Sequence, residues 1–205
     1  MIHGERFNSI SHLLGALLAV AGTALLVTRA ALLGDPWKIV SFSIYGATLM
    51  ALYLASTLYH SLRGRAKAVF KKIDHCAIYL LIAGSYTPFA LVTLHGPRGW
   101  LLLGLAWGLA AVGIVQELWL ARGKRLSSLL IYLLMGWLAL LVVVPLWHAL
   151  TPAGLAWLVV GGACYTLGLV FYVGAPRIRH GHGIWHLFVL AGSACHYLAI
   201  LLYVA

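Results

Sequence analysis

The sequence predicts an all-α integral membrane protein built as a bundle of seven transmembrane helices. Of its 205 residues, 63% are hydrophobic and only 9% are charged, whereas a soluble domain has roughly 45–50% apolar and 25% charged residues. The mean hydropathy is +0.97. The apolar residues form continuous blocks, not the alternating pattern of a membrane β-barrel. We therefore expect one membrane domain over residues 1–205.

Seven apolar blocks are each close to the roughly 20 residues that a helix needs to cross the hydrocarbon layer. In chain order, the predicted spans are residues 9–28, 39–61, 73–94, 99–120, 127–147, 154–173 and 184–204. The first contains the apolar run from Ile10 to Val27, which is long enough to stay in the bilayer. Pro88 and Pro145 fall inside the third and fifth spans, where proline is expected to kink a helix.

The basic residues predict how the bundle is oriented. The formal net charge is +10, but the Lys and Arg residues lie in short runs between apolar blocks, and no nucleic-acid-binding motif accompanies them. Only Arg29, Lys38 and Arg98 of the 14 fall on the side that faces away from the N-terminus. Because short cytoplasmic loops carry the excess of positive charge, we expect a multi-pass protein of the cell (inner) membrane, with the N-terminus cytoplasmic and the C-terminus outside.

Polar residues from four distant segments are predicted to meet at the cytoplasmic end of the bundle. They are Glu5, Asn8 and His12 at the start of the first span, Ser56 and His60 at the end of the second, Asp74 and His75 at the opening of the third, and His182 and His186 at the opening of the seventh. Ionisable residues inside membrane segments are costly and usually functional. Their convergence at one depth therefore predicts a functional site.

The spacing of the histidines indicates a metal site. His182 and His186 are four residues apart, so they are stacked neighbours on one helix face. With His60 they supply three neutral nitrogens, the number typical of an open, catalytic zinc site that keeps one position for water. Asp74 could hold or deprotonate that water, and Ser56, one turn before His60, could hydrogen-bond the water or a substrate oxygen.

Simpler interpretations of the same residues stay open. The histidines could form interhelical hydrogen bonds or lie at the interface, Asp74 could pair with a nearby Lys or Arg, and Ser56 could be a packing residue. Glu5, Asn8 and His12 could cap and anchor the first helix or brace the metal ligands, and bracing is preferred. His75 is expected at the membrane interface. His196, about 15 Å beyond His186 along the helix, is expected to hydrogen-bond another helix.

Four stretches carry a family resemblance: "ERFNSISH" at residues 5–12, "STLYH" at 56–60, "KKIDHCAIYLLIAGSYTPF" at 71–89 and "HGIWHLFVLAGSACH" at 182–196. The chain resembles bacterial hemolysin III-type members of the progestin and adipoQ receptor superfamily, which includes the adiponectin receptors, and more remotely the alkaline ceramidases. The resemblance implies one zinc ion bound by His60, His182 and His186, with Asp74 holding a water at the metal and Ser56 beside it. It also implies a ceramide-like or fatty-acyl lipid as substrate or ligand; no protein partner is indicated.

Several functions remain in competition at this stage. The first is a zinc-dependent hydrolase of lipid amides or esters that acts in membrane lipid homeostasis. The second is a non-enzymatic regulator or sensor of membrane state with a structural zinc site. A proton or ion pathway is less favoured because few charged residues lie deep in the outer half. A haemolytic pore is disfavoured because the chain lacks the amphipathic, water-soluble form such a toxin needs.

Overall fold

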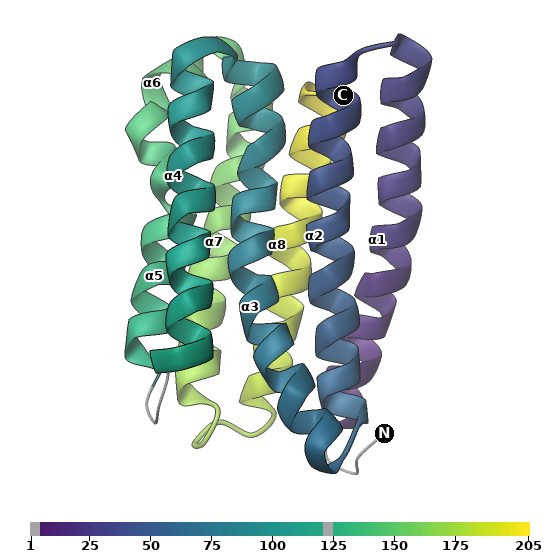
Figure 1. Ribbon diagram of the computed structural model, residues 1–205, viewed down its shortest axis with the longest axis vertical. Coiled ribbons are helices and arrows are strands. Elements are labelled where there is room, and N and C mark those ends of the chain that lie inside the picture. The colour runs from purple at the N-terminus through teal and green to yellow at the C-terminus, as the bar shows by residue number, and fades with distance from the viewer. Residues whose placement is uncertain (1–4, 121–124) are drawn as a thin grey trace.

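The computed structural model describes residues 5–120 and 125–205. Within these ranges, seven helical spans are long and apolar enough to cross a membrane, as the composition predicts. They form one bundle. In Figure 1, the first helix lies at one edge and α8 is seen between the third and second helices. The chain is a multi-pass membrane protein.

The first two spans form a helical hairpin, α1 (Arg6–Leu33) and α2 (Pro36–Ser61). Gly34 ends α1 in the left-handed conformation (φ 66°) that favours glycine. Asp35 then caps α2 by accepting hydrogen bonds from the backbone N–H groups of Trp37 and Lys38 (2.9 and 3.1 Å), and Pro36 occupies the first turn, where no N–H is needed. These signals make the turn only a few residues long.

The third span begins much earlier than hydropathy predicts. Helix α3 (Gly64–Pro88) starts nine residues before the expected boundary at 73. The residues before position 73 include basic residues that are good helix formers, and these extend the helix beyond its apolar part. Asp74 and His75 were expected at the start of the third helix. They lie instead about three turns inside α3. After Pro88 the helix widens into a π-helical turn, η1 (Phe89–Leu94).

The fourth span is α4 (Gly96–Val115), followed by a π-helical turn, η2 (Gln116–Leu120). The fifth is interrupted: α5 (Leu126–Gly136) gives way to a 3-10 segment, η3 (Leu138–Val142), and then to α6 (Val143–Ala149). The irregularity starts before Pro145, where the kink was expected. The hydroxyl of Tyr86 enters the helix there, donating to the Gly136 carbonyl (2.7 Å) and accepting from the Ala139 N–H (3.2 Å), so the freed backbone groups stay paired.

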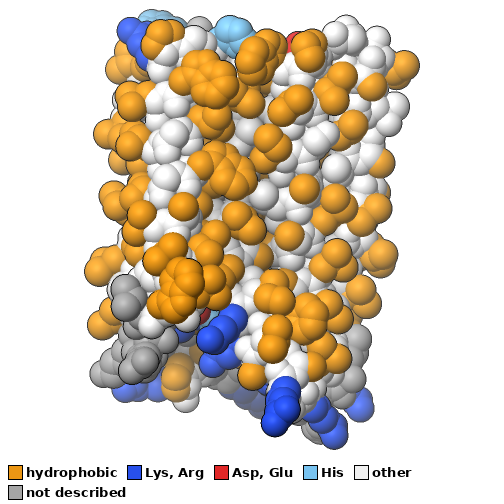
Figure 2. All heavy atoms as spheres, in the orientation of Figure 1, with side chains coloured by type: hydrophobic (Ala, Val, Ile, Leu, Met, Phe, Trp, Pro, Cys, Tyr) orange, Lys and Arg blue, Asp and Glu red, His pale blue; other side chains and the backbone are white. Residues whose placement is uncertain are grey.

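The last two spans, α7 (Pro152–Gly174) and α8 (Gly181–Tyr203), pack along each other, and α8 also contacts α1. Figure 2 shows most of the visible Lys and Arg side chains at the lower end of the bundle, the end at which the chain begins in Figure 1. Arg122 and Lys124, which contribute to the predicted charge asymmetry, lie outside the described residues. That this end is cytoplasmic stays a prediction from the charge pattern.

Candidate metal centre

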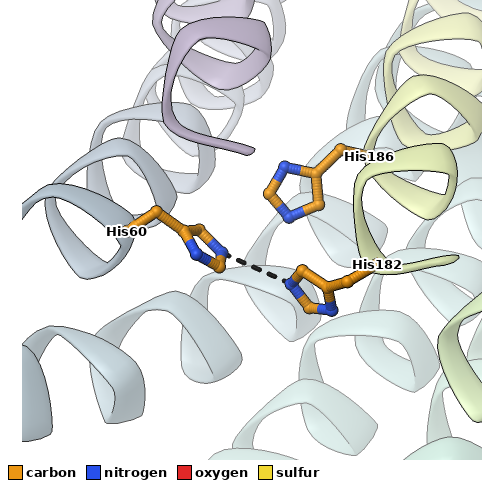
Figure 3. A group of neighbouring side chains, drawn as sticks. All are labelled: His60, His182 and His186. Atoms are coloured by element: carbon orange, nitrogen blue, oxygen red, sulfur yellow. Dashed lines mark hydrogen bonds between the residues drawn. The ribbon is translucent and has the colours of Figure 1, made fainter. Parts of the chain in front are cut away.

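Three histidines from two helices meet at the N-terminal end of the bundle. His60 comes from the last turn of α2, and His182 and His186 come from the first turns of α8 (Figure 3). One ring nitrogen from each lies within 4.8 Å of the other two, so the group could hold a metal ion. His60 and His186 are buried, and His182 is partly exposed. The structure thus brings together the three residues predicted as metal ligands.

Hydrogen bonds on the far side of two rings determine which nitrogen is free. The Nδ1–H of His60 donates to Oε2 of Glu5 (3.2 Å), and the Nδ1–H of His186 donates to the backbone carbonyl of Asn8 (3.2 Å). Both acceptors lack a proton to give, so in the neutral imidazoles each Nε2 carries a lone pair. Metal-binding histidines almost always make such a second hydrogen bond.

The donor set fits a divalent cation such as zinc. Nε2 of His60 lies 3.3 Å from Nε2 of His182, and two nitrogens bound at about 2.0–2.1 Å to one tetrahedral ion would be roughly 3.3–3.4 Å apart. Nε2 of His186 is buried and has no hydrogen-bond partner among the described residues. A buried nitrogen without a partner costs free energy, and a cation between the three rings would remove that cost.

The start of α1 is held against these ligands by two close contacts. The hydroxyls of Ser9 and Ser61 are 2.6 Å apart, which ties α1 to the end of α2. On the other side, Gly183 of α8 lets α1 approach closely: a Cβ at this position would lie 2.3 Å from Cδ1 of Phe7. These contacts bring Glu5 and the Asn8 carbonyl to His60 and His186.

Glu5 is shared between His60 and a lysine. Its Oε2 also accepts a hydrogen bond from Nζ of Lys67 on α3 (2.6 Å). Burial raises the pKa of the Glu5 carboxyl, but the hydrogen bonds and charges of Lys67 and His60 more than offset this, so its pKa lies below the usual value. The carboxylate therefore stays ionised and able to accept from His60.

The third residue predicted to brace the ligands, His12, contacts them in a different way. Its ring stacks on His186, with ring centroids 3.7 Å apart and an angle of 16° between the planes, and it meets Tyr53 edge-on at 5.1 Å. His12 is 2% exposed. It packs against a predicted ligand and makes no hydrogen bond to it.

The two residues predicted to be catalytic, Asp74 and Ser56, are both buried. Ser56 on α2 is 1% exposed and Asp74 on α3 is 5% exposed, and the two side chains lie close to each other. No described contact joins Asp74 directly to the three imidazoles. Its relation to the candidate metal site comes through the cavity that it lines.

This cavity has a volume of about 110 Å³ and lies inside the bundle. Its wall is largely apolar and is built from α1, α2, α3, α5, α7 and α8. His12 and Asp74 line it, as do Trp185 and Tyr172, whose rings also pack around His182. The cavity therefore lies next to the three-histidine group and could accept an apolar chain.

A second polar cluster was missed from the sequence. His75 was expected at the interface, but it is buried, and its Nδ1–H donates to Oε1 of Glu117 (3.1 Å). Glu117 is also buried; it pairs with Arg125 and accepts from the Ser128 hydroxyl (3.1 Å). The sequence does contain an indication of this cluster, because Glu117 is a carboxylate within an apolar block, where ionisable residues are rare. The cluster ties α3, η2 and α5 together.

His196 lies where the sequence predicts, deeper in α8. Its Nε2–H donates to the backbone carbonyl of Leu158 on α7 (3.3 Å). The expected interhelical hydrogen bond is confirmed.

Seven membrane-spanning segments and a buried three-histidine group define a polytopic membrane protein with a candidate metal centre. The sequence model of the family described as "Haemolysin-III related" matches residues 1–197. The chain belongs to this family.

Individual relatives agree with this assignment. The chain is 42% identical over 201 residues to "Hemolysin-3" of Bacillus cereus, covering 98% of this chain and 91% of the relative. It is 43% identical over 203 residues to "Hemolysin-3 homolog" of Bacillus subtilis (strain 168), covering 98% and 95%. A more distant match, 25% over 232 positions, is to "Adiponectin receptor protein" of Drosophila melanogaster, covering 97% of this chain and 50% of the receptor. The predicted resemblance to hemolysin III-type proteins and to the adiponectin receptors is confirmed.

Proposed function

We propose that this protein is a zinc-dependent hydrolase that cleaves the amide or ester bond of a ceramide-like or other fatty-acyl lipid within the membrane. One observation carries the proposal: three imidazoles, two with an Nε2 lone pair fixed by Glu5 and Asn8, lie beside an apolar cavity that Asp74 also lines. His60, His182 and His186 would hold the zinc. When bound at three imidazoles, zinc polarises a carbonyl and lowers the pKa of water to about 7.

The remaining chemistry falls to side chains of the chain itself. Hydrolysis of a lipid amide consumes one water, breaks the C–N bond and yields a fatty acid and an amine. The Asp74 carboxylate orients the water and accepts its proton, and it returns that proton to the leaving amine. The Ser56 hydroxyl, next to Asp74, holds the carboxylate in position. The apolar wall of the cavity binds the acyl chain and keeps bulk water out.

Release of free fatty acid by the purified protein in lipid nanodiscs tests this proposal. A ceramide-like amide and a matched ester serve as substrates, and each sample is assayed for metal. Asp74→Asn is expected to abolish release while metal content is unchanged. Ser41→Ala on α2, at a buried serine whose hydroxyl bonds only a local backbone carbonyl, is the control and is expected to leave release intact. Turnover that survives Asp74→Asn would exclude Asp74 as the base.

The positions of the ligands also support a second candidate, a non-enzymatic regulator of membrane state. The candidate ligands come from α2 and α8, and the groups that hydrogen-bond them come from the start of α1. A metal there would join the hairpin of α1 and α2 to α8, which is far away in sequence. This function predicts that chelation lowers the melting temperature and that metal-loaded protein releases no fatty acid.

A further inference from the structure

Helix α3 is longer than a bilayer crossing requires. With the π-helical turn η1 it forms one helical span, Gly64–Leu94, of 31 residues, which is about 46 Å at a rise of roughly 1.5 Å per residue. The hydrocarbon layer is only about 30 Å thick. The excess lies at the N-terminal end, because every Lys and Arg of this span falls between residues 65 and 72. Residues 64–73, the α3 extension, therefore lie at the depth of the lipid head groups.

The α3 extension projects from the bundle. In Figure 1 the first turns of α3 reach furthest toward the end at which the chain begins. Most of its side chains are exposed, and only Lys67 and Phe70 are partly buried. Lys67 fastens the extension to its neighbours, since Nζ donates to Oε2 of Glu5 (2.6 Å) and lies 4.9 Å from the ring centroid of Tyr59. The remaining side chains of the extension are thus free to meet a partner.

Two adjoining stripes of the extension differ in character. Arg65 and Lys72 are seven residues apart, so they share one helix face. Val69 and Ile73, four residues apart, form a stripe beside it and are 56% and 44% exposed. An uncovered apolar stripe next to a basic one suits the boundary between lipid head groups and acyl chains.

The positive charge of the extension has no counter-charge within the protein. The chain has only four acidic residues. All four are engaged or buried elsewhere: Glu5 with Lys67, Asp35 at the cap of α2, Asp74 in the bundle interior and Glu117 with Arg125. The C-terminus lies at the opposite end of the bundle (Figure 1). The exposed cations of the extension therefore have no acidic partner among the described residues: Arg65, Lys71 and Lys72.

We propose that the α3 extension binds the head groups of anionic phospholipids in the leaflet at this end of the bundle. Its three exposed cations pair with lipid phosphates, and Val69 and Ile73 contact the first carbons of the acyl chains. Each Lys or Arg near an anionic membrane surface strengthens the attraction by roughly fivefold. An acidic protein could match the charge, but the apolar stripe lies where acyl chains begin. The interaction requires neither metal nor turnover.

Native mass spectrometry of detergent-purified protein can measure this preference. Palmitoyl-oleoyl phosphatidylglycerol and palmitoyl-oleoyl phosphatidylcholine are the probes, because they share acyl chains and differ in net head-group charge. We expect wild type to bind the phosphatidylglycerol about five- to thirtyfold more tightly, the effect of one or two basic residues. The double variant Arg65→Gln/Lys72→Gln is expected to lose most of this preference. Equal affinities of wild type for the two lipids would overturn the proposal.

Arg177→Gln/Arg179→Gln is the matched control. It removes the same charge from two exposed arginines at the same end of the bundle, in the turn between α7 and α8. Its preference should stay close to that of wild type. An equal loss in the two double variants would show that overall positive charge selects the lipid, and would contradict the assignment to the extension. The wild-type comparison tests the proposal even if a variant does not fold, and it does not depend on hydrolase activity.

Discussion

The Nε2 atoms of His60 and His182 lie 3.3 Å apart, although the residues are separated by 122 positions in the chain. Two facing nitrogens without a shared proton or cation would repel each other. A proton donated by His182 or a bound cation satisfies this contact, and with the buried His186 the pair forms a group that could hold a metal ion.

Glu5 is expected to strengthen metal binding through His60. Glu5→Gln removes the negative charge of the side chain that accepts the Nδ1–H hydrogen bond of His60. Zinc affinity should fall about 10–100-fold, as is typical when a residue that orients a metal ligand is changed. Competition with a chromophoric chelator in detergent measures this. Arg6→Gln, an exposed neighbour, changes the net charge by one unit and should have little effect. Because Arg6→Gln removes a positive charge and Glu5→Gln a negative one, a general charge effect would instead raise the affinity of Arg6→Gln by as much as Glu5→Gln lowers it.

Asn8 should behave differently from Glu5, because its backbone carbonyl contacts His186. Asn8→Ala keeps that carbonyl, so zinc affinity is expected to fall by less than about tenfold, below the Glu5 effect. The same chelator competition measures it. A loss as large as that of Glu5→Gln would show that the side chain is needed.

Gly183 is expected to be intolerant of a side chain. In Gly183→Ala the new Cβ would meet Phe7 at 2.3 Å and push α1 away from α8. We expect a loss of about 1–3 kcal/mol in stability, the usual cost of overpacking, together with weaker metal binding. Gly104→Ala, with no atom within 4 Å of the added Cβ, is the matched control in thermal unfolding. Equal melting temperatures for the two variants would contradict the packing argument.

Glu5 also gives a pH dependence with a definite sign. Its folded-state pKa is lowered, so its contribution to stability is present above the unfolded pKa and is lost as the pH falls through the folded value. In metal-free protein, wild type should therefore melt above Glu5→Gln at neutral pH, and the gap should shrink below about pH 4.5. A gap that widens on acidification would contradict the pKa direction.

The Glu117 cluster is expected to affect stability and not metal content. Glu117→Ala leaves His75 and Arg125 without their carboxylate partner, which should cost roughly 1–3 kcal/mol. Thermal unfolding measures the loss, and metal content should match the wild type. Loss of metal in this folded variant would show that the two clusters are coupled.

Much of the fold could be predicted from the sequence because hydrophobic length determines which segments can span a membrane. The start of α3 and the break after α5 could not. Basic helix formers extend α3 past its apolar part, and the break depends on Tyr86, a residue from another helix. A hydropathy profile reports neither helix propensity nor contacts between helices, so it could not predict these two features.

In the candidate site too, some features could be predicted from the sequence and others depend on contacts between helices. The i, i+4 spacing of His182 and His186 predicts their pairing, and the end of the second span predicts His60. The sequence could not indicate that Asn8 acts through its backbone or that His12 stacks on His186, because both depend on how α1 approaches α8. Glu117 was missed because its partners come from two other segments, α3 and the start of α5.

Elemental analysis of detergent-purified protein tests the central claim most directly. Wild type is compared with His186→Ala and with His148→Ala, an exposed histidine outside the site. We predict about one zinc per chain in wild type and His148→Ala, and loss of zinc in His186→Ala, as expected for three-imidazole coordination. Well-folded wild-type protein without stoichiometric metal would contradict the account.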